Sequence, residues 1–478
     1  MLFNSIEFAI FLPIVFILYW FVANKKLKYQ NLLIVIVSYI FYGWWDWRFL
    51  SLIILSSFVD FWVGLKLSNE TGEKKRKYWL YVSIFTNLSI LGFFKYYNFF
   101  IGNFVSAFSF LGINFDPFTL QIILPIGISF YTFQTLSYSI DVYRKKLQPT
   151  HDIIAFFAYV SFFPQLVAGP IERATNLLPQ FFKTRVFEYS KAVDGMRQIL
   201  WGLFKKIVIA DNCAKYANEI FNNYTEYSGS TLLLGGILFA FQIYGDFSGY
   251  SDIAIGTARL FGFNLMQNFA FPYFSRDIAE YWRRWHISLS SWFRDYVYYP
   301  LGGSRVGTAK KVRNVFIIFV VSGFWHGANW TFIAWGFLNA VYFLPLLLFK
   351  RNRKNLDTIA EGKLFPGFRE IIQLFSTLVL VLFAKILFRS RTISDAINYS
   401  AGIFSKSLFT FPEVFPTMVL VLLLIFIMVE WIQREKSYAL NLDGVKLPKL
   451  ARVAIYYSII FSILWLGGDQ QEFIYFQF

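Results

Sequence analysis

The 478-residue chain has only three histidines, His151, His286 and His326, so few of its side chains could transfer protons near neutral pH. His326 lies in residues 322–330 (SGFWHGANW), inside a run from 315 to 349 that has no Asp, Glu, Lys or Arg. An ionisable group at membrane depth costs free energy and marks a functional site by default. Because burial disfavours the charged imidazole, His326 is predicted to be neutral and able to act as a general base.

The residues around His326 leave two interpretations open. Gly323 and Gly327 flank Trp325 and His326 and would let a substrate approach the backbone closely, which favours a functional histidine. The structural alternative is an imidazole that hydrogen-bonds a backbone carbonyl or the side chain of Asn329.

His286 lies in residues 281–290 (YWRRWHISLS), among cationic side chains at an expected membrane edge. It could orient a substrate or act as a second proton-transfer group, or it could simply hydrogen-bond lipid or the loop. His151, beside Asp152 in a basic loop, is expected to be solvated. No metal site is expected, because His286 and His326 are about forty residues apart without an acidic ligand pattern and Cys213 is the single cysteine.

Four carboxylates are expected at or near membrane depth: Asp60, Asp141, Asp246 and Asp252. On an unbroken helix the side chains of Asp246 and Asp252 would lean to opposite faces. Gly245 and Gly249 predict a break in that helix, which would let both carboxylates reach one cavity. The structural alternative is that they pair with the arginines of residues 276–313.

The composition identifies a membrane protein. Hydrophobic residues make up 56% of the chain and charged residues only 15%, with a mean hydropathy of +0.48. Soluble globular proteins carry about 25% charged residues, so this chain could not cover a water-exposed surface. The net charge of +16 is clustered between apolar runs, which indicates loops facing anionic lipid head groups and not nucleic acid.

The apolar runs predict about ten to twelve membrane spans, since each needs about 20 mostly apolar residues. Clear candidates are residues 8–23, 31–45, 50–65, 78–94, 118–140, 231–245 with its continuation, 315–349, 371–387, 414–429 and 453–466. Residues 153–171 and 196–210 are less clear. The basic loops between spans, such as residues 25–28 and 74–77, are expected on the cytoplasmic side, which puts the N-terminus outside.

Three runs are not expected to be simple spans. As one straight helix, residues 315–349 would be about 52 Å long, so a break is predicted near Gly323 and Gly327. Residues 118–140 and 153–171 contain internal proline and glycine. Irregular backbone at membrane depth occurs only where it is buried in protein or lines a cavity. Residues 272–313, rich in arginine, tryptophan and tyrosine, are expected along the interface.

Two motifs resemble the membrane-bound O-acyltransferase family: residues 284–303 (RWHISLSSWFRDYVYYPLGG) and 323–330 (GFWHGANW). Within it the chain looks like the alginate O-acetylation branch. The similarity extends along the whole chain, through residues 124–134 (LPIGISFYTFQ), 163–173 (FPQLVAGPIER), 244–252 (YGDFSGYSD) and 473–478 (FIYFQF).

The resemblance implies a fold, a location and a reaction. The fold is an all-α, polytopic integral membrane protein, a ring of tilted and broken helices around a central tunnel, formed as one domain by residues 1–478. His326 matches the family's essential histidine, and His286 matches a second position nearer the cytoplasmic side. Relatives in the bacterial inner membrane move an acyl group to an extracytoplasmic polysaccharide or cell-wall polymer, often with a separate periplasmic or surface partner that completes the transfer.

A mechanism follows from the resemblance and the residues together. The expected donor is a cytoplasmic thioester, acetyl-CoA, which reacts as a substrate and is not a bound cofactor. Its phosphates would meet Arg283, Arg284 and Arg294. His326 would take the proton of an acceptor hydroxyl as that oxygen attacks the thioester, or would itself be acylated. The further substrate-binding residues expected are Asn329 and Asp246.

Two alternatives stay open at this point. D-alanine transfer to teichoic acid from a carrier protein is the nearest one within the same class. A secondary transporter or flippase would also show broken helices and polar groups at the membrane midplane. However, no paired internal repeat is visible in the sequence. Gly-x-Ser-x-Gly, phosphate-loop and dinucleotide-binding patterns are absent, which argues against a conventional hydrolase or kinase.

Overall fold

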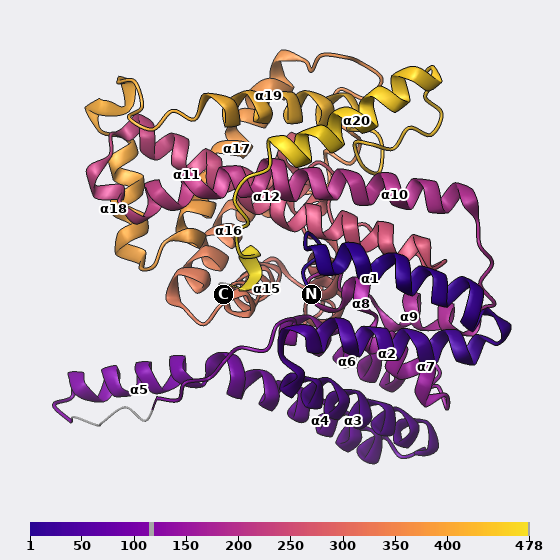
Figure 1. Cartoon of the computed structure of the whole chain (residues 1–478). Helices are drawn as coiled ribbons and strands as arrows, with labels where there is room; N and C mark the ends of the chain where they lie inside the picture. The colour runs from indigo at the N-terminus through magenta and orange to yellow at the C-terminus, as the bar shows by residue number, and fades with distance from the viewer. Residues whose placement is uncertain (114–118, 477–478) are drawn as a thin grey trace. The chain divides into compact units, whose positions relative to one another are not determined.

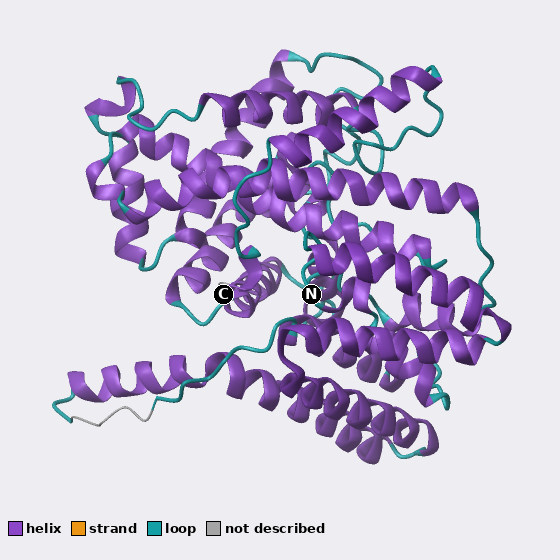
Figure 2. Ribbon diagram, in the orientation of Figure 1, coloured by secondary structure: helices purple, strands orange, loops and turns teal. Residues whose placement is uncertain are grey.

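The computed structural model describes residues 1–113 and 119–476, and every regular element in these ranges is a helix (Figure 2). The all-α prediction is confirmed for this part of the chain. Five helical stretches are long and apolar enough to cross a membrane: Ile6–Lys25, Leu27–Asn69, Gly229–Leu260, Trp330–Leu348 and Phe368–Arg389. The chain is therefore a polytopic membrane protein. The larger number of spans and the ring around a tunnel stay predictions.

The chain divides into two compact units, whose helices carry the labels used in Figure 1. Unit 1 contains residues 1–192 and 257–265, and unit 2 contains residues 193–256 and 266–478. Two helices, α10 (Tyr189–Leu203) and α12 (Gly229–Leu260), have residues in both units. The expected single domain over residues 1–478 stays a prediction.

Unit 1 is a bundle in which α2 packs on α7, and α3 packs on both α4 and α6. Aromatic side chains fill its core; the rings of Phe41 and Phe163, for example, lie 5.6 Å apart. The helical elements of unit 1 are α1 (Ile6–Ile17), η1 (Leu18–Val22), η2 (Ala23–Lys25), α2 (Leu27–Asp46), η3 (Trp47–Phe49), α3 (Leu50–Asn69), α4 (Glu73–Leu91), η4 (Gly92–Tyr96), α5 (Tyr97–Phe110), α6 (Ile128–Tyr143), α7 (Ile153–Ser161), α8 (Phe163–Leu166), α9 (Ala174–Leu177) and η5 (Leu178–Phe182).

Two irregular segments predicted in unit 1 are confirmed. Residues 119–127 are not helical, and α6 begins only after Gly127, whose φ of 75° is left-handed. A Cβ at Gly127 would lie 2.7 Å from the carbonyl oxygen of Leu166, so the chain passes too close for any other residue. The run from 153 to 171 splits into α7 and the short α8, and its last residues are not helical.

Unit 2 combines long helices with short, broken ones. Its elements beyond α10 and α12 are η6 (Phe204–Ala210), α11 (Asp211–Asn222), η7 (Tyr224–Glu226), η8 (Pro272–Phe274), α13 (Ile278–Arg284), α14 (Ile287–Phe293), η9 (Arg294–Tyr298), α15 (Thr308–His326), α16 (Trp330–Leu348), α17 (Phe368–Arg389), α18 (Ile393–Ile403), η10 (Lys406–Phe409), α19 (Thr417–Ile432), α20 (Lys449–Trp465) and η11 (Ile474–Phe476). Residues 272–313 hold only short elements until α15 begins, so no span lies between η8 and α15; their interfacial position stays a prediction.

The break predicted in the charge-free run is confirmed, because α15 ends at His326 and α16 begins at Trp330. The flanking glycines have a different role from the expected one. A Cβ at Gly323 would collide with the backbone oxygen of Phe332, and one at Gly327 would collide with the Phe332 ring. These glycines therefore allow α15 and α16 to pack closely, and the space beside them is filled by protein.

The break predicted at Gly245 and Gly249 is wrong, since α12 is continuous from Gly229 to Leu260. Both glycines lie where α12 meets the chain of α10 and η6. A Cβ at Gly249 would lie 2.8 Å from the carbonyl oxygen of Gly202, and one at Gly245 would lie 2.9 Å from that of Lys205. Small residues at such spacing let two backbones approach in a membrane protein, so here glycine serves packing and not a kink.

Candidate active site

Two buried histidines meet in unit 2. His326 is the last residue of α15, and His286 precedes the first turn of α14. Their ring centroids lie 6.4 Å apart, and the residues are 5% and 1% exposed. The structure therefore brings together the two histidines that the sequence singled out.

Aromatic rings enclose both imidazoles. His326 lies 4.9 Å from the Trp325 ring, 5.1 Å from Trp335 and 5.4 Å from Phe388, and His286 lies 4.6 Å from Phe247. Such walls exclude water and disfavour an imidazolium ion. For His286, which lies outside the membrane-spanning helices, burial lowers the pKa to about 3. A neutral imidazole can accept a proton from a bound substrate.

A strained corner holds His286 in place. Its φ of 44° is left-handed, a region that non-glycine residues rarely adopt. Asn268, which is fully buried, accepts hydrogen bonds from the Ile287 N–H at its carbonyl (2.9 Å) and from the Ser288 hydroxyl at its side chain (2.8 Å). The Asn268 amide also donates to Ser251 Oγ of α12. Backbone strain of this kind persists where the surroundings over-determine the conformation, often at functional sites.

Tyr475 is a member of this cluster that the sequence reasoning did not assign. Its hydroxyl oxygen lies 3.5 Å from Nδ1 of His286, and its ring lies 5.9 Å from that of His326. The signal in the sequence was the ending at residues 473–478, which pointed to a family branch but not to a position in space.

Asp246 anchors the segment that carries Tyr475. One carboxylate oxygen accepts a hydrogen bond from the Ile474 N–H (2.7 Å), and the other pairs with Lys206 Nζ (2.8 Å). Lys206 also pairs with Asp211 (2.8 Å) and donates to the carbonyl oxygen of Gln471. This buried ionic cluster fixes the C-terminal chain beside α12, so the contacts of Asp246 give it a positioning role.

Asp252 has a separate partner on η6. Its carboxylate pairs with Lys205 Nζ at 2.6 Å and accepts a hydrogen bond from the Gln198 amide at 2.7 Å. The alternative that Asp246 and Asp252 pair with arginines of residues 276–313 is therefore wrong. The π-helical turns of η6 place two adjacent lysines toward one continuous helix, a geometry that side-chain spacing alone did not suggest.

Lys385 of α17 is a second residue that sequence reasoning missed. It is buried, and its ammonium lies 3.9 Å from the centre of the Trp285 ring, the residue before His286. Phe388, one turn further along α17, contacts His326. No carboxylate of residues 1–113 or 119–476 pairs with Lys385, and its side-chain nitrogen faces the rings of Tyr273 and Trp285.

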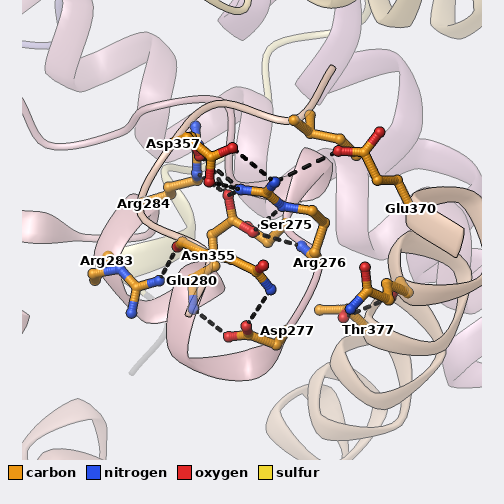
Figure 3. A network of polar contacts seen from close by, with 12 residues as sticks. Ser275, Arg276, Asp277, Glu280, Arg283, Arg284, Asn355, Asp357, Glu370 and Thr377 are labelled. Carbon is orange, nitrogen blue, oxygen red and sulfur yellow. Dashed lines mark hydrogen bonds and ion pairs between the residues drawn. The ribbon is translucent and has the colours of Figure 1, made fainter. Parts of the chain in front are cut away.

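The arginines before His286 belong to a polar network (Figure 3). Arg276 is its centre, with Glu280 at 3.0 Å, Asp357 at 3.1 Å and Glu370 at 3.5 Å. The hydrogen bond from Arg276 holds the pKa of the Asp357 carboxyl below its usual range. Arg284 pairs with Glu280 at 2.9 Å, so the network ties α13 to the loop after α16.

The remaining predicted substrate contacts also have partners within the protein. Arg283 donates to the backbone oxygens of Asn352 and Asn355, as Figure 3 shows for the second of these. Arg294 is exposed and pairs with the adjacent Asp295 at 2.8 Å. Asn329 caps α16 by accepting from the Thr331 N–H, and its amide donates to the Arg391 carbonyl. Their roles in binding substrate stay predictions.

Comparison with known proteins identifies the family of the chain. The membrane-bound O-acyltransferase family profile matches residues 40–383, a range that includes both histidines. The chain belongs to this family. The predicted resemblance is thereby confirmed, and the acyltransferase is an enzyme and not the transporter that its broken helices also allowed.

Named relatives refine the relationship. The chain is 39% identical to the probable alginate O-acetylase of Pseudomonas putida over 408 residues, 85% of this chain and 80% of that protein. It is 37% identical to the peptidoglycan O-acetyltransferase of Helicobacter pylori over 370 residues, covering 71% and 69%. Identity to the teichoic acid D-alanyltransferase of Bacillus subtilis is 28% over 252 residues, covering 50% and 62%.

Proposed function

We propose that this membrane-bound O-acyltransferase transfers an acetyl group from a cytoplasmic thioester, acetyl-CoA, towards hydroxyl groups of an extracytoplasmic polysaccharide or cell-wall polymer. The observation that carries the proposal is the pair of buried imidazoles inside an aromatic wall. Identity to the two O-acetylating relatives is higher and covers more of the chain than identity to the D-alanyltransferase, which favours acetyl over D-alanyl transfer.

His326 is the proposed general base. As the acceptor oxygen attacks the thioester carbonyl, the new C–O bond forms, the C–S bond breaks, and the hydroxyl proton passes through His326 to the departing thiolate. Proton transfer by a positioned side chain contributes typically about 10²- to 10⁴-fold to a rate. The break after His326 supports this role, because it ends α15 at the imidazole and leaves the side chain at the edge of a helix.

His286 and Tyr475 are proposed to orient the reacting groups. The hydroxyl of Tyr475 lies within reach of His286, and both rings lie beside His326. Asp246 acts through Tyr475, because it fixes the backbone of the preceding residue. These residues are positioning groups in the proposal, and His326 alone takes the proton.

For the donor, Arg294 is the residue best suited to meet the phosphates of acetyl-CoA, because it is exposed and its one ion pair among residues 1–113 and 119–476 is with the adjacent Asp295. Arg283 and Arg284 are proposed to hold the loop that precedes His286. Asn329 is proposed to keep the helix break in place. The enzyme is proposed to lie in the inner membrane of a bacterium and to work with a separate periplasmic or surface protein that completes the transfer.

The test is acyl transfer by the purified full-length protein in lipid vesicles. Release of free thiol from acetyl-CoA should require the wild-type enzyme and should be lost in His326→Ala. His151→Asn, a change at an exposed histidine, should behave as wild type. Transfer from a D-alanyl carrier protein without turnover of acetyl-CoA would overturn the acetyl assignment.

A further inference from the structure

A cavity of about 490 Å³ lies entirely within unit 1, formed by residues 175–191, the end of α12 and Trp20 of η1. It contains neither histidine and has no part in the proposed reaction. Its position, charge and rim together indicate a ligand.

Positive charge dominates the cavity. Four cationic side chains line it, Lys183, Arg185, Lys191 and Arg259, against one acid, Glu188. The Glu188 carboxylate is already paired with Lys191 at 2.7 Å. A ligand that complements this surface carries negative charge.

Arg185 is held rigidly without an acidic partner. Its guanidinium donates to the side-chain oxygens of Asn31 (2.6 Å) and Gln30, and it lies 4.8 Å from the centre of the Phe263 ring. No carboxylate of residues 1–113 or 119–476 contacts Arg185 or Lys183, so these charges are not neutralised within the described chain. Arginine and lysine together suit phosphate oxygens, which accept several charge-assisted hydrogen bonds.

The cavity lies at the level where two apolar helical stretches end. Trp20 lies near the end of the stretch Ile6–Lys25, and Arg259 lies in the last turn of Gly229–Leu260. Lys25 ends the first stretch, and Lys26 and Lys28 follow it, which places this end on the cytoplasmic side. Anionic lipids are concentrated in that leaflet, and basic pockets between spans bind their head groups.

The rim provides the apolar part of a lipid site. Val186 and Phe187 line the cavity but are 71% and 45% exposed, and the Phe187 ring packs edge-on against Trp20 at 5.6 Å. A soluble phosphate compound has no apolar part to contact the exposed apolar side chains beside the cations, whereas the acyl chains of a lipid would cover them. Cations and apolar side chains side by side match the two halves of a phospholipid.

We propose that this cavity, residues 175–191 with Trp20 and Arg259, binds the phosphate head group of an anionic phospholipid whose acyl chains lie along Val186 and Phe187. The site is separate from the acyl-transfer reaction. It serves as a specific lipid contact of unit 1.

The test measures lipid binding by the full-length protein in detergent, with short-chain phosphatidylglycerol as the probe and native mass spectrometry as the readout. The double variant Lys183→Gln/Lys191→Gln should bind the probe at least about tenfold more weakly. The matched control, Lys74→Gln/Lys77→Gln, removes two exposed lysines of α4 in the same unit and should stay within about twofold of wild type. Equal loss in both double variants would overturn the proposal, since it would reflect net charge alone.

Two further arms separate the lipid from a free anion. Val186→Asn should weaken phosphatidylglycerol binding and leave the weak binding of inorganic phosphate unchanged. Phosphatidylcholine of the same chain length should bind more weakly than phosphatidylglycerol. If glycerol phosphate binds as tightly as phosphatidylglycerol, or if phosphatidylcholine does, the anionic-lipid assignment is wrong.

Discussion

Asp60 in unit 1 and His326 in unit 2 are both buried polar side chains, yet their surroundings differ. The carboxylate of Asp60 accepts hydrogen bonds from the Asn87 amide and the Ser139 hydroxyl, each at 2.7 Å, and from the Ser83 hydroxyl. Its partners come from α4 and α6, so one acid ties three helices together. His326 instead lies among the rings of Trp325, Trp335 and Phe388.

The difference distinguishes a polar side chain that stabilises the fold from one that is suited to react with a substrate. Hydroxyl and amide donors satisfy the lone pairs of the Asp60 carboxylate. These hydrogen bonds within the protein stabilise the fold. Aromatic walls exclude water from an imidazole and disfavour its charged form, so the neutral ring can accept a proton from a substrate. Two clusters of similar burial therefore predict opposite responses to mutation.

The largest expected effect is that of His326→Ala on activity. Removing the base should lower the rate of acetyl transfer by about 10²- to 10⁴-fold, because no positioned side chain then takes the proton from the attacking hydroxyl group. Initial rates of thiol release from acetyl-CoA, normalised to folded protein, measure this loss. Activity within twofold of the His151→Asn control would contradict the chemical role of the cluster.

Asp60→Ala should have the converse signature. It leaves the donors of Ser83, Asn87 and Ser139 buried without their acceptor, which costs about 1–3 kcal/mol of stability. The rate per folded molecule should not change. Thermal unfolding in detergent, followed alongside the transfer assay, tests both halves of this expectation. A variant that melts as wild type but has lost its activity would place Asp60 among the functional groups.

The two clusters also show what the sequence could and could not predict. The helix break beside His326 was predictable, because a charge-free run longer than the bilayer cannot be one straight helix, and α15 ends at His326. The continuity of α12 was not, because a glycine at Gly249 can either kink a helix or let a second backbone approach. Only the backbone packed against it, that of α10 and η6, decides between these outcomes.

The remaining members of the site could not be predicted, because they lie far from the two histidines along the chain. Tyr475 reaches His286 through a C-terminal segment that lacks regular structure before η11, and no periodicity announces such a path. The arginines before His286 were expected to meet substrate phosphates. In the structure Arg284 pairs with Glu280, and Arg283 donates to the carbonyl oxygens of Asn352 and Asn355 in a loop whose fold the sequence did not suggest.

At His286 the comparison concerns the backbone as well as the side chain. His286→Ala and His286→Asn both remove the imidazole, but asparagine tolerates the left-handed conformation at φ 44° far better. The alanine variant should therefore be about 1–2 kcal/mol less stable than the asparagine variant. Chemical or thermal unfolding of the two proteins side by side measures the difference, and equal stabilities would show that the corner relaxes.

The same residue predicts a response to acid. Burial lowers the pKa of His286 to about 3 from its ordinary value of 6.5, so the unfolded chain binds a proton more readily than the native one. Above pH 6.5 His286 is neutral in both states and does not oppose folding. As pH falls from 6.5 towards 3, only the unfolded chain takes up the proton, so the free energy of unfolding decreases. Wild type should therefore lose more stability than His286→Asn between pH 7.5 and pH 5. An identical loss in both would mean that other groups control the acid response.

The smallest expected effect is that of Tyr475→Phe, which keeps the ring and removes only the hydroxyl beside His286. A hydrogen bond of this kind contributes about 0.5–1.5 kcal/mol, so the transfer rate should fall by about two- to tenfold without loss of stability. Tyr457→Phe, at an exposed tyrosine of α20 in the same unit, is the matched control and should have no effect.

Because Asp246 fixes the chain at Ile474, Asp246→Asn combined with Tyr475→Phe should lower the rate little more than Asp246→Asn alone. Additive losses would show that Asp246 acts on the reaction independently of Tyr475, and the C-terminal segment would then be a packing element and not part of the catalytic arrangement.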